Sequence, residues 1–170
     1  MTRDPRPGDH ATPPAAPESP GLDVGVVIAR LDAGDAEEAL EILAARLLAD
    51  GHVTAAFPAA LTERERRWPT GLPTAVPTAI PHAHPEHVIR PCLAIASLAR
   101  ALPFGEMGRA GGTVDVQLVV VPLLMDASAH LAALQRMMAL LRDEDAVADL
   151  VAAADAAQLR SRAAGYLGGR

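Results

Sequence analysis

The chain has 170 residues, half of them hydrophobic but only 2% aromatic, and a formal net charge of −6 with 15 arginines and no lysine. An acidic chain without a basic run argues against nucleic-acid binding, and the lone Cys92 excludes an internal disulfide and a cysteine-based zinc site. The N-terminus lacks the apolar run of a signal peptide, and no apolar stretch is long enough to cross a bilayer. We therefore expect a cytoplasmic protein without membrane insertion.

The first half of the chain predicts a tail, one strand and two helices. Residues 1–20 hold six of the fifteen prolines and are expected to form a disordered tail. The run Val24–Leu31 is rich in β-branched residues and predicts a strand. Asp35 is expected to cap a helix that ends at Ala49, before Gly51. Residues 58–66 predict a shorter, highly charged helix.

The second half predicts further strands followed by helices, which favours an α/β domain over residues 21–167. The valine-rich stretch 113–121 is the best candidate for a buried central strand. Asp126 or Ser128 is expected to cap a helix whose apolar stripe comprises Leu131, Leu134, Met138 and Leu141. The other expected elements are a strand at 91–98, a loop or short edge strand at 104–108, and helices at 143–154 and 157–167.

A helix cannot run through the segment Arg64–His87, because prolines fall at every fourth position from Pro69 onward. Residues before prolines favour extended geometry, so a loop leading into a short strand is expected. The segment ends with three of the six histidines of the chain, and its prolines are Pro69, Pro73, Pro77, Pro81 and Pro85. A rigid segment that brings imidazoles together indicates a functional site.

His82 is the residue of this segment best suited to carry a phosphoryl group. A neutral imidazole is nucleophilic at cellular pH, and Pro81 gives it a rigid support at a strand end. Arg64 supplies a planar cation suited to phosphate, and His130 lies at an expected helix start, where free N–H groups favour an anion. The non-functional alternatives are that His82 is a solvated surface residue, that His130 is packed on its neighbours at the helix start, and that Arg64 belongs to a solvated charged face.

A zinc site is the competing interpretation of the histidine cluster. The spacing His82-x-His84-x-x-His87 resembles the H-x-H-x-D-H motif of metallo-β-lactamase-like hydrolases, and imidazoles at this spacing can bind Zn²⁺. Those enzymes use further ligands from a longer chain, and Pro85 restricts how this segment can fold around a metal.

Several motifs together resemble the fructose/mannitol-type enzyme IIA of the sugar phosphotransferase system, the type-2 EIIA domain. They are R-E-x-x-x-P-T-G-L-P-T from Arg64, A-I-P-H ending at His82, P-E-H-V, F-G-E-M at 104–107, the strand 114–121 and the helix with an H-L-x-x-L start at His130. The resemblance covers roughly residues 24–155, and the T-G-L-P-T element is most similar to the galactitol-type branch.

This resemblance implies a mixed β-sheet covered by helices on both faces and a role as a phosphocarrier. His82 would accept a phosphoryl group from the carrier protein HPr on its ε nitrogen and pass it to a cysteine of enzyme IIB, assisted by Arg64 and His130. No metal, nucleotide or other cofactor is implied, and the sugar itself would not be bound.

Two further expectations qualify this resemblance. Galactitol-type relatives carry Thr-Asp after the active-site histidine, whereas this chain departs from that branch with Ala83-His84. A regulatory module that signals through its phosphorylation state is the alternative function, although the presence of both Arg64 and His130 favours a carrier. His87 is expected to be a structural residue of the following turn.

Overall fold

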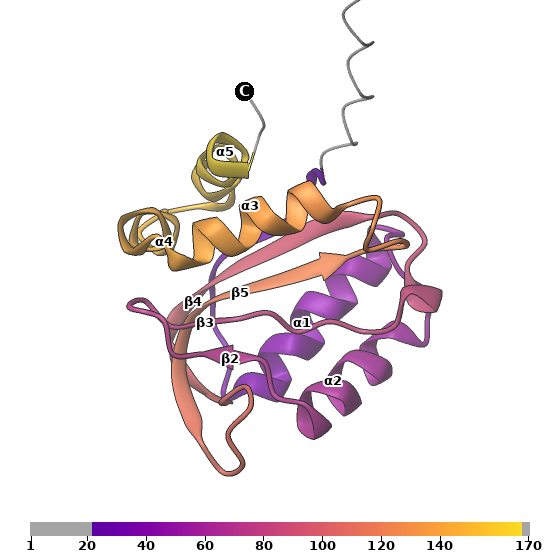
Figure 1. The fold of residues 1–170 in the computed structure, drawn as a ribbon, viewed down its shortest axis with the longest axis horizontal. Helices are drawn as coiled ribbons and strands as arrows, with labels where there is room; N and C mark the ends of the chain where they lie inside the picture. Colours follow the sequence, from indigo (N-terminus) through magenta and orange to yellow (C-terminus); the bar gives the residue numbers. More distant parts are fainter. Residues whose placement is uncertain (1–21, 168–170) are drawn as a thin grey trace, which may run out of the picture.

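A five-stranded mixed sheet organises the computed structural model, which describes residues 22–167 of the chain (Figure 1). The strand order is β1-β4-β5-β3-β2, so β5 lies in the centre. β4 runs parallel to β1 and antiparallel to β5, while β3 runs parallel to β5 and antiparallel to β2. The strands are β1 Val24–Leu31, β2 Gly71–Leu72, β3 Thr78–Ala79, β4 Cys92–Gly105 and β5 Thr113–Leu123.

Helices cover both faces of this sheet, as Figure 1 shows. α1 and α2 pack on one face, and α3, α4 and α5 pack on the other. The predicted α/β domain with a mixed sheet covered on both faces is therefore confirmed. The helices are α1 Ala36–Ala49, α2 Phe57–Arg67, α3 Leu131–Arg142, α4 Glu144–Val151 and α5 Ala156–Leu167, with a 3₁₀ turn, η1, at Pro85–His87.

Each face of the sheet has its own hydrophobic core, because successive side chains of a strand point to opposite faces. Along β4, Ala94 and Ala96 belong to the core beneath α1 and α2. Leu93 and Ile95 belong to the core beneath α3, α4 and α5. The first part of β4, residues 92–98, is therefore buried throughout and almost entirely apolar, as expected of a strand that is covered on both sides.

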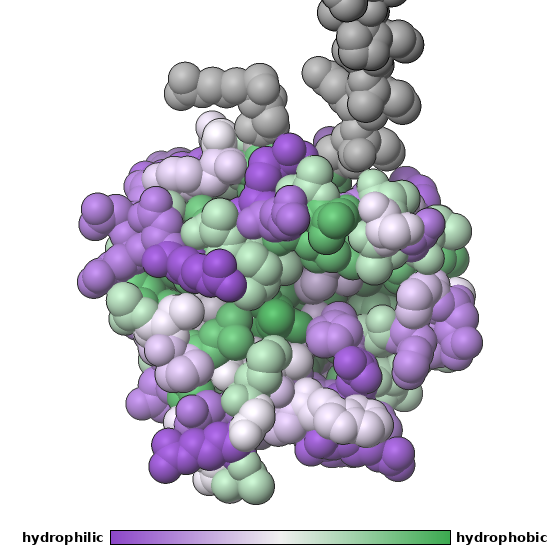
Figure 2. All heavy atoms as spheres, in the orientation of Figure 1, coloured by the Kyte–Doolittle hydropathy of each residue, from purple (hydrophilic) through white to green (hydrophobic). Residues whose placement is uncertain are grey.

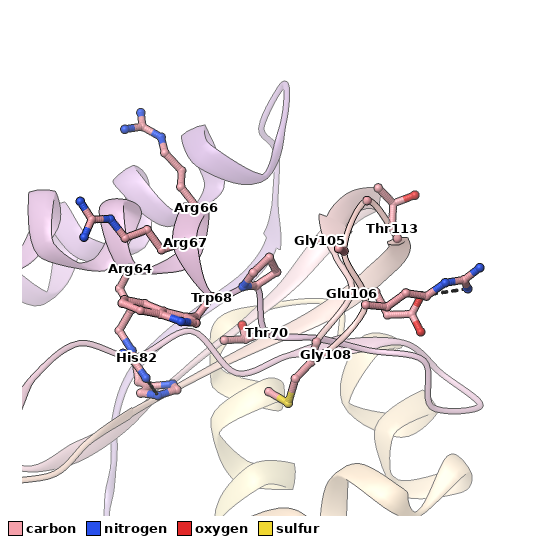
Figure 3. A pocket seen from close by; sticks show the side chains of 16 residues that line it. Arg64, Arg66, Arg67, Trp68, Thr70, His82, Gly105, Glu106, Gly108 and Thr113 are labelled. Atoms are coloured by element: carbon pink, nitrogen blue, oxygen red, sulfur yellow. Dashed lines mark hydrogen bonds and ion pairs between the residues drawn. The ribbon is translucent and has the colours of Figure 1, made fainter.

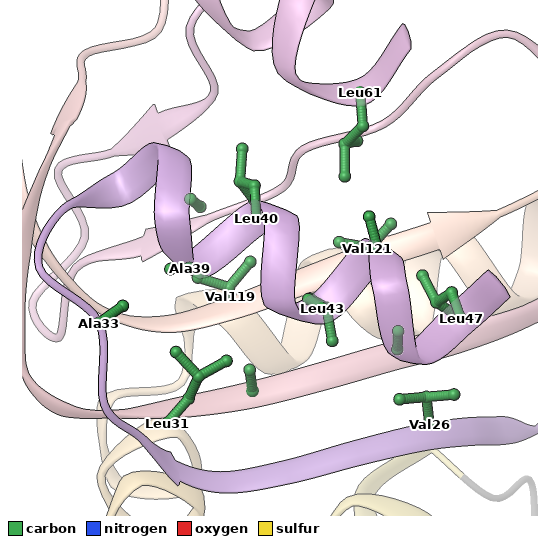
Figure 4. Packing of buried hydrophobic residues seen from close by; sticks show 14 of the residues in the cluster. Val26, Leu31, Ala33, Ala39, Leu40, Leu43, Leu47, Leu61, Val119 and Val121 are labelled. Carbon is green, nitrogen blue, oxygen red and sulfur yellow. The ribbon is translucent and has the colours of Figure 1, made fainter. Parts of the chain in front are cut away.

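The helix α1 forms where the sequence predicts it. The side chain of Asp35 accepts a hydrogen bond from the backbone N–H of Glu38 at 2.9 Å and so caps the helix. Figure 4 shows Leu43 of α1 pointing toward the strands and Leu40 pointing toward α2. Leu40, Leu43 and Leu47 are at most 1% exposed. Each such burial contributes about 1.5–3 kcal/mol relative to an exposed leucine.

The end of β4 differs from the prediction. Residues 104–108 were expected to form a loop or short edge strand, but β4 runs to Gly105 and stays paired with β5 through Phe104 and Gly105. β1 ends opposite Leu98, so the later part of β4 has no strand on that side among the described residues. Pro103 is tolerated there because its missing N–H has no partner to lose.

The predicted cap of α3 is wrong. Neither Asp126 nor Ser128 caps this helix; its N-cap position is His130, which makes no side-chain capping bond. The carboxylate of Asp126 instead accepts hydrogen bonds from the backbone N–H and the hydroxyl of Ser128 and closes a turn before the helix. Leu131, expected in the buried stripe, is 56% exposed.

The proline segment folds back on itself beside the end of β4. The two-residue strands β2 and β3 pair with each other, and β3 also joins β5. Gly71 and Gly105 allow this close approach: a Cβ on Gly71 would lie 2.6 Å from the carbonyl oxygen of Gly105. A Cβ on Gly105 would in turn lie 2.6 Å from Cβ of Pro69. The P-T-G and F-G-E motifs are thus packed against each other.

The expected tail at residues 1–20 and the first residue of the expected domain, Gly21, lie outside the described residues. Among residues 22–167, every helix is too short or too polar to cross a lipid bilayer.

Candidate functional site

His82 follows β3 and is held by hydrogen bonds at both ring nitrogens. Its Nδ1 lies 2.9 Å from the backbone carbonyl oxygen of Ile80. Its Nε2 lies 2.8 Å from Nη2 of Arg64, 18 residues earlier in the chain. The ring is half-buried, and Pro81 before it is buried.

These partners determine which nitrogen of neutral His82 carries the proton. The carbonyl oxygen of Ile80 can only accept, so Nδ1 must donate. The guanidinium of Arg64 can only donate, so Nε2 must present its lone pair. His82 is therefore held in the tautomer whose nucleophilic atom is Nε2, facing a cation.

Arg64 reaches His82 from the last turns of α2. Its guanidinium lies 5.5 Å from the centre of the Trp68 ring, one helical turn further along. Among the described residues it forms no ion pair with a carboxylate, and its buried Nε has no hydrogen-bond partner. By contrast, Arg66 pairs with Glu37 and Arg67 pairs with Glu63. Arg64 is therefore free of carboxylates that would compete with a phosphate.

An open hollow of about 680 Å³ adjoins these two residues (Figure 3). In the figure, the side chains of Arg66 and Arg67 point away from His82, whereas Arg64 extends toward it. Trp68 is 58% exposed and Met107 is 41% exposed, so the hollow also offers apolar surface. A wide hollow with one cation at the histidine suits a visiting protein better than an enclosed small molecule.

More apolar surface lies beside this segment. Figure 2 shows hydrophobic atoms in the middle of the face between α3 and the β2–β3 segment, with hydrophilic atoms toward its left and lower edges. The partly buried hydrophobic residues there include Leu72, Val76, Ile80, Leu134 and Met138.

Glu65 anchors the start of the proline segment to α2. One carboxylate oxygen accepts from the backbone N–H of Thr70 at 2.9 Å, and the other accepts from its hydroxyl at 2.8 Å. Burial raises the pKa of Glu65, against the lowering effect of these hydrogen bonds and of Arg64. Thr70 is only 2% exposed, so this clamp lies beneath the surface.

His130 lies near the same edge of the sheet, because β3 and β5 run parallel and His130 follows β5. It is 9% exposed, and its Nδ1 lies 2.9 Å from the carbonyl oxygen of Asp126. Nδ1 must therefore donate, and Nε2 of the neutral ring is an acceptor. Within residues 22–167, no hydrogen bond joins His130 to His82 or Arg64. The structure joins Arg64 and His82 by a hydrogen bond, and His130 has no such bond to either of them among the described residues.

His84 and His87, the other two histidines of the segment, do not form a ligand site with His82 in the described residues. His84 is exposed and precedes η1. His87 has an 18% exposed side chain whose Nδ1 lies 3.4 Å from the hydroxyl oxygen of Thr54. Among residues 22–167, no group of three or more His, Cys, Asp or Glu side chains is arranged to hold a metal ion. The zinc-site alternative therefore finds no ligand set in the described residues.

Cys92 is a buried core residue at the start of β4. Its Sγ lies 3.4 Å from Nδ1 of His52, and the side chain is 2% exposed. Burial raises the pKa of the Cys92 thiol to about 11. A thiol that stays protonated is a poor nucleophile, so Cys92 plays no part in this chemistry.

Sequence reasoning assigned no role to Glu65, Trp68 or Met107. Glu65 lies inside the charged run 63–67, where a solvated side chain is the default expectation. The only signal was its place in the R-E-x-x-x-P-T-G-L-P-T motif, five residues before Thr70. The contact of Arg64 with His82 could be named from the resemblance but not from spacing.

One family of known proteins matches most of this chain. The family described as "Phosphoenolpyruvate-dependent sugar phosphotransferase system, EIIA 2" matches residues 22–162. No curated protein matches the sequence.

Solved structures share the fold. The mannitol-specific cryptic phosphotransferase enzyme IIA CmtB from Escherichia coli has a TM-score of 0.64 and 24% identity, over 86% of this chain and 92% of that one. A complex of enzyme IIA for mannitol with its phosphorylated enzyme IIB, also from E. coli, has a TM-score of 0.67 and 19% identity, over 88% of this chain and 99% of that one. The nitrogen regulatory protein IIA-Ntr from Neisseria meningitidis has a TM-score of 0.59 and 19% identity, over 80% of this chain and 91% of that one.

Proposed function

Because this chain belongs to the EIIA 2 family of the phosphoenolpyruvate-dependent sugar phosphotransferase system, we propose that it is a phosphocarrier whose acceptor is His82. His82 receives a phosphoryl group from phosphorylated HPr and passes it to a cysteine of enzyme IIB. The contacts of His82 are the main support: Nδ1 donates to Ile80, and Nε2 presents its lone pair toward Arg64.

The proposed partners fit an open site. The E. coli mannitol enzyme IIA with a related fold was solved in complex with its phosphorylated enzyme IIB. In this chain, the hollow beside His82 is wide, and exposed Trp68 and Met107 offer apolar contacts to a docking protein. Donor and acceptor bind the same face in turn, so the domain over residues 21–167 needs no pocket for the sugar.

The proposed transfer uses groups that the chain itself provides. Nε2 of His82 attacks phosphorus in line with the leaving nitrogen of the donor, and the Nδ1 proton stays hydrogen-bonded to Ile80 while positive charge develops on the ring. Arg64 shifts from Nε2 to the phosphoryl oxygens, where its fixed charge stabilises the transition state. No cofactor is required for this step.

His130 can assist only in one protonation state if its present hydrogen bond persists. Nδ1 donates to Asp126, so Nε2 can donate to a phosphoryl oxygen only when the ring carries both protons. We assign His130 the role of a cationic donor that approaches once the phosphoryl group is in place.

The sugar branch rests on sequence alone. The T-G-L-P-T element at 70–74 supports a phosphotransferase system for a galactitol-like polyol. We propose that this chain acts in the cytoplasm as the phosphocarrier of such a system. His84 stands where galactitol-type relatives have an aspartate, so contacts with enzyme IIB at this position differ in this chain.

Incubation with phosphorylated HPr, followed by intact mass measurement, tests the proposal. We expect the wild type to gain the mass of one phosphoryl group, H82A to gain none, and H84A and H87A to be labelled like the wild type. Equal labelling of H82A, or an unlabelled wild type, would overturn the assignment.

A regulatory role is the second candidate, because the nitrogen regulatory protein IIA-Ntr shares the fold. Adding enzyme IIB of the same organism to the phosphorylated protein separates the two functions. Loss of the label from His82 with its appearance on a IIB cysteine supports the carrier. A label that stays on His82 supports the regulator.

A further inference from the structure

We propose that Glu65 is a positioning residue that sets the orientation and tautomer of His82, which rests on the proposed role of His82 as the phosphoryl acceptor. Two consecutive residues of α2 thereby control the two opposite nitrogens of one imidazole. Arg64 acts directly on Nε2, and Glu65 acts on Nδ1 through the backbone of Thr70 and Ile80.

The first step of this connection is the clamp between Glu65 and Thr70. Both carboxylate oxygens are used, at 2.9 Å from the backbone nitrogen and 2.8 Å from the hydroxyl oxygen of Thr70. A charged acceptor with two donors from one residue defines the position of that residue closely. Because Thr70 is buried, water is poorly placed to replace these bonds.

The second step leads from Thr70 to the ring. The carbonyl oxygen of Thr70 accepts from the backbone N–H of Ile80 at 3.4 Å, beside the β2–β3 pairing. The carbonyl oxygen of Ile80 then accepts from Nδ1 of His82 at 2.9 Å. The backbone dipole that holds the Nδ1 proton is therefore set by the position of Thr70.

This orientation affects the chemistry and not only the fold. When Nε2 forms its bond to phosphorus, the Nδ1 proton stays on the ring and positive charge develops on the imidazole. The Ile80 carbonyl stabilises that charge only if it faces Nδ1. If the segment shifts, neutral His82 can place its proton on Nε2 and lose the nucleophilic lone pair.

Other contacts keep the segment folded without Glu65. The backbone N–H of Met107 donates to the carbonyl of Gly71 at 2.8 Å, and β2 stays paired with β3. Loss of the carboxylate should therefore loosen His82 without unfolding the domain.

The test uses E65A, E65Q and the matched control E63A, which removes an exposed glutamate from the same helix. Nitrogen-15 NMR of the His82 ring reports its tautomer directly. We expect a protonated Nδ1 and an unprotonated Nε2 in neutral wild type, E65Q and E63A, because a glutamine amide can still accept from the Thr70 N–H. E65A should show a mixture of tautomers and faster exchange of the Nδ1 proton.

A kinetic measurement with phosphoramidate as the donor needs no partner protein. Nε2 forms the new bond to phosphorus while the donor's phosphorus–nitrogen bond breaks and its nitrogen leaves as ammonia. We expect labelling of His82 to be about tenfold slower in E65A, and within about twofold of wild type in E65Q and E63A. If E65A is too unstable, T70V should show a smaller change in the same direction.

A wild-type tautomer and exchange rate in folded E65A would overturn the proposal. The same conclusion would follow if E65A and T70V were labelled as fast as E63A. Neither result depends on HPr or enzyme IIB, so failure of the positioning role can be told apart from failure of the phosphocarrier role.

Discussion

Arg64 donates a hydrogen bond from Nη2 to Nε2 of His82 at 2.8 Å, and Nε2 is the atom that attacks phosphorus in the proposed transfer. In the resting protein this contact favours the tautomer with its lone pair on Nε2 and keeps a cation beside that atom. In the proposed transfer, the arriving phosphoryl group bonds to this lone pair, and Arg64 then contacts the phosphoryl oxygens. Under that proposal, the same guanidinium favours the nucleophilic tautomer before the reaction and stabilises charge during it.

We predict that R64A slows phosphorylation of His82 by about 10²–10³-fold, the cost typical of losing one oriented donor at a reacting centre. R64K should recover part of the loss, because an ammonium restores the charge but not the planar fork. The measurement is the rate of mass gain with phosphorylated HPr. R67A is the matched control, since Arg67 lies in the same helix, is 65% exposed and pairs with Glu63.

A rate for R64A within threefold of R67A would mean that the hydrogen bond to Nε2 has no role in transfer. Thermal unfolding of both variants distinguishes this effect from loss of the fold.

Much of the fold could be predicted because local signals agree with the tertiary structure. Asp35 is a good N-cap and does cap α1. The apolar run at 113–121 is the central strand β5, which extends to Leu123. The end of β4 could not be predicted, because Arg100 and Pro103 interrupt its pattern where it becomes an edge strand.

The site was predicted only as far as the resemblance reached. Arg64 and His82 are 18 residues apart, with β2 and β3 of two residues each between them, so no periodicity brings them together. The role of Glu65 depends on burial of Thr70, and a charged run on a helix gives no sign of burial. His130 was expected in the first turn of a helix that begins near Ser128, but Asp126 closes a turn there and His130 becomes the N-cap of α3.

We predict that G105A destabilises the fold by about 1–3 kcal/mol, the usual cost of overpacking. The new Cβ would lie 2.6 Å from Cβ and 2.7 Å from Cγ of Pro69, at the junction that holds the site. The matched control is G165A in α5, where the added Cβ meets no described atom within 4 Å apart from its chain neighbours and the backbone of its own helix. That substitution should stabilise by up to about 1 kcal/mol through helix propensity.

Urea unfolding of the two variants and the wild type gives the comparison. Equal stability of G105A and G165A would contradict the close packing of the P-T-G segment on β4.

We predict that Cys92 is unreactive in the folded protein. Burial raises the pKa of its thiol from 9.0 to about 11, so almost no thiolate is present at pH 8, and the side chain is 2% exposed. A disulfide reagent at pH 8 should label the chain slowly in buffer and rapidly in concentrated urea. Rapid labelling without urea, with the fold intact, would show that the start of β4 opens readily.

We predict that the stability of wild type relative to E65Q falls as pH rises above the ordinary glutamate value of 4.5. Burial raises the pKa of Glu65 in the folded protein, so the folded state holds this proton more tightly than the unfolded state. The contribution of Glu65 is therefore complete below pH 4.5 and is lost as pH rises through the folded pKa. The amide of E65Q carries no such proton and keeps a bond to Thr70.

The measurement is urea unfolding of both proteins at a series of pH values from 4 to 8, with the difference in the free energy of unfolding taken at each pH. Because all other titrating groups are the same in the two proteins, their contributions cancel in the difference between the two free energies of unfolding. A difference that moves in favour of wild type as pH rises would mean that the hydrogen bonds from Thr70 and the charge of Arg64 outweigh burial. Glu65 would then clamp the segment most firmly as a carboxylate, and E65Q would be the weaker substitute for it at neutral pH.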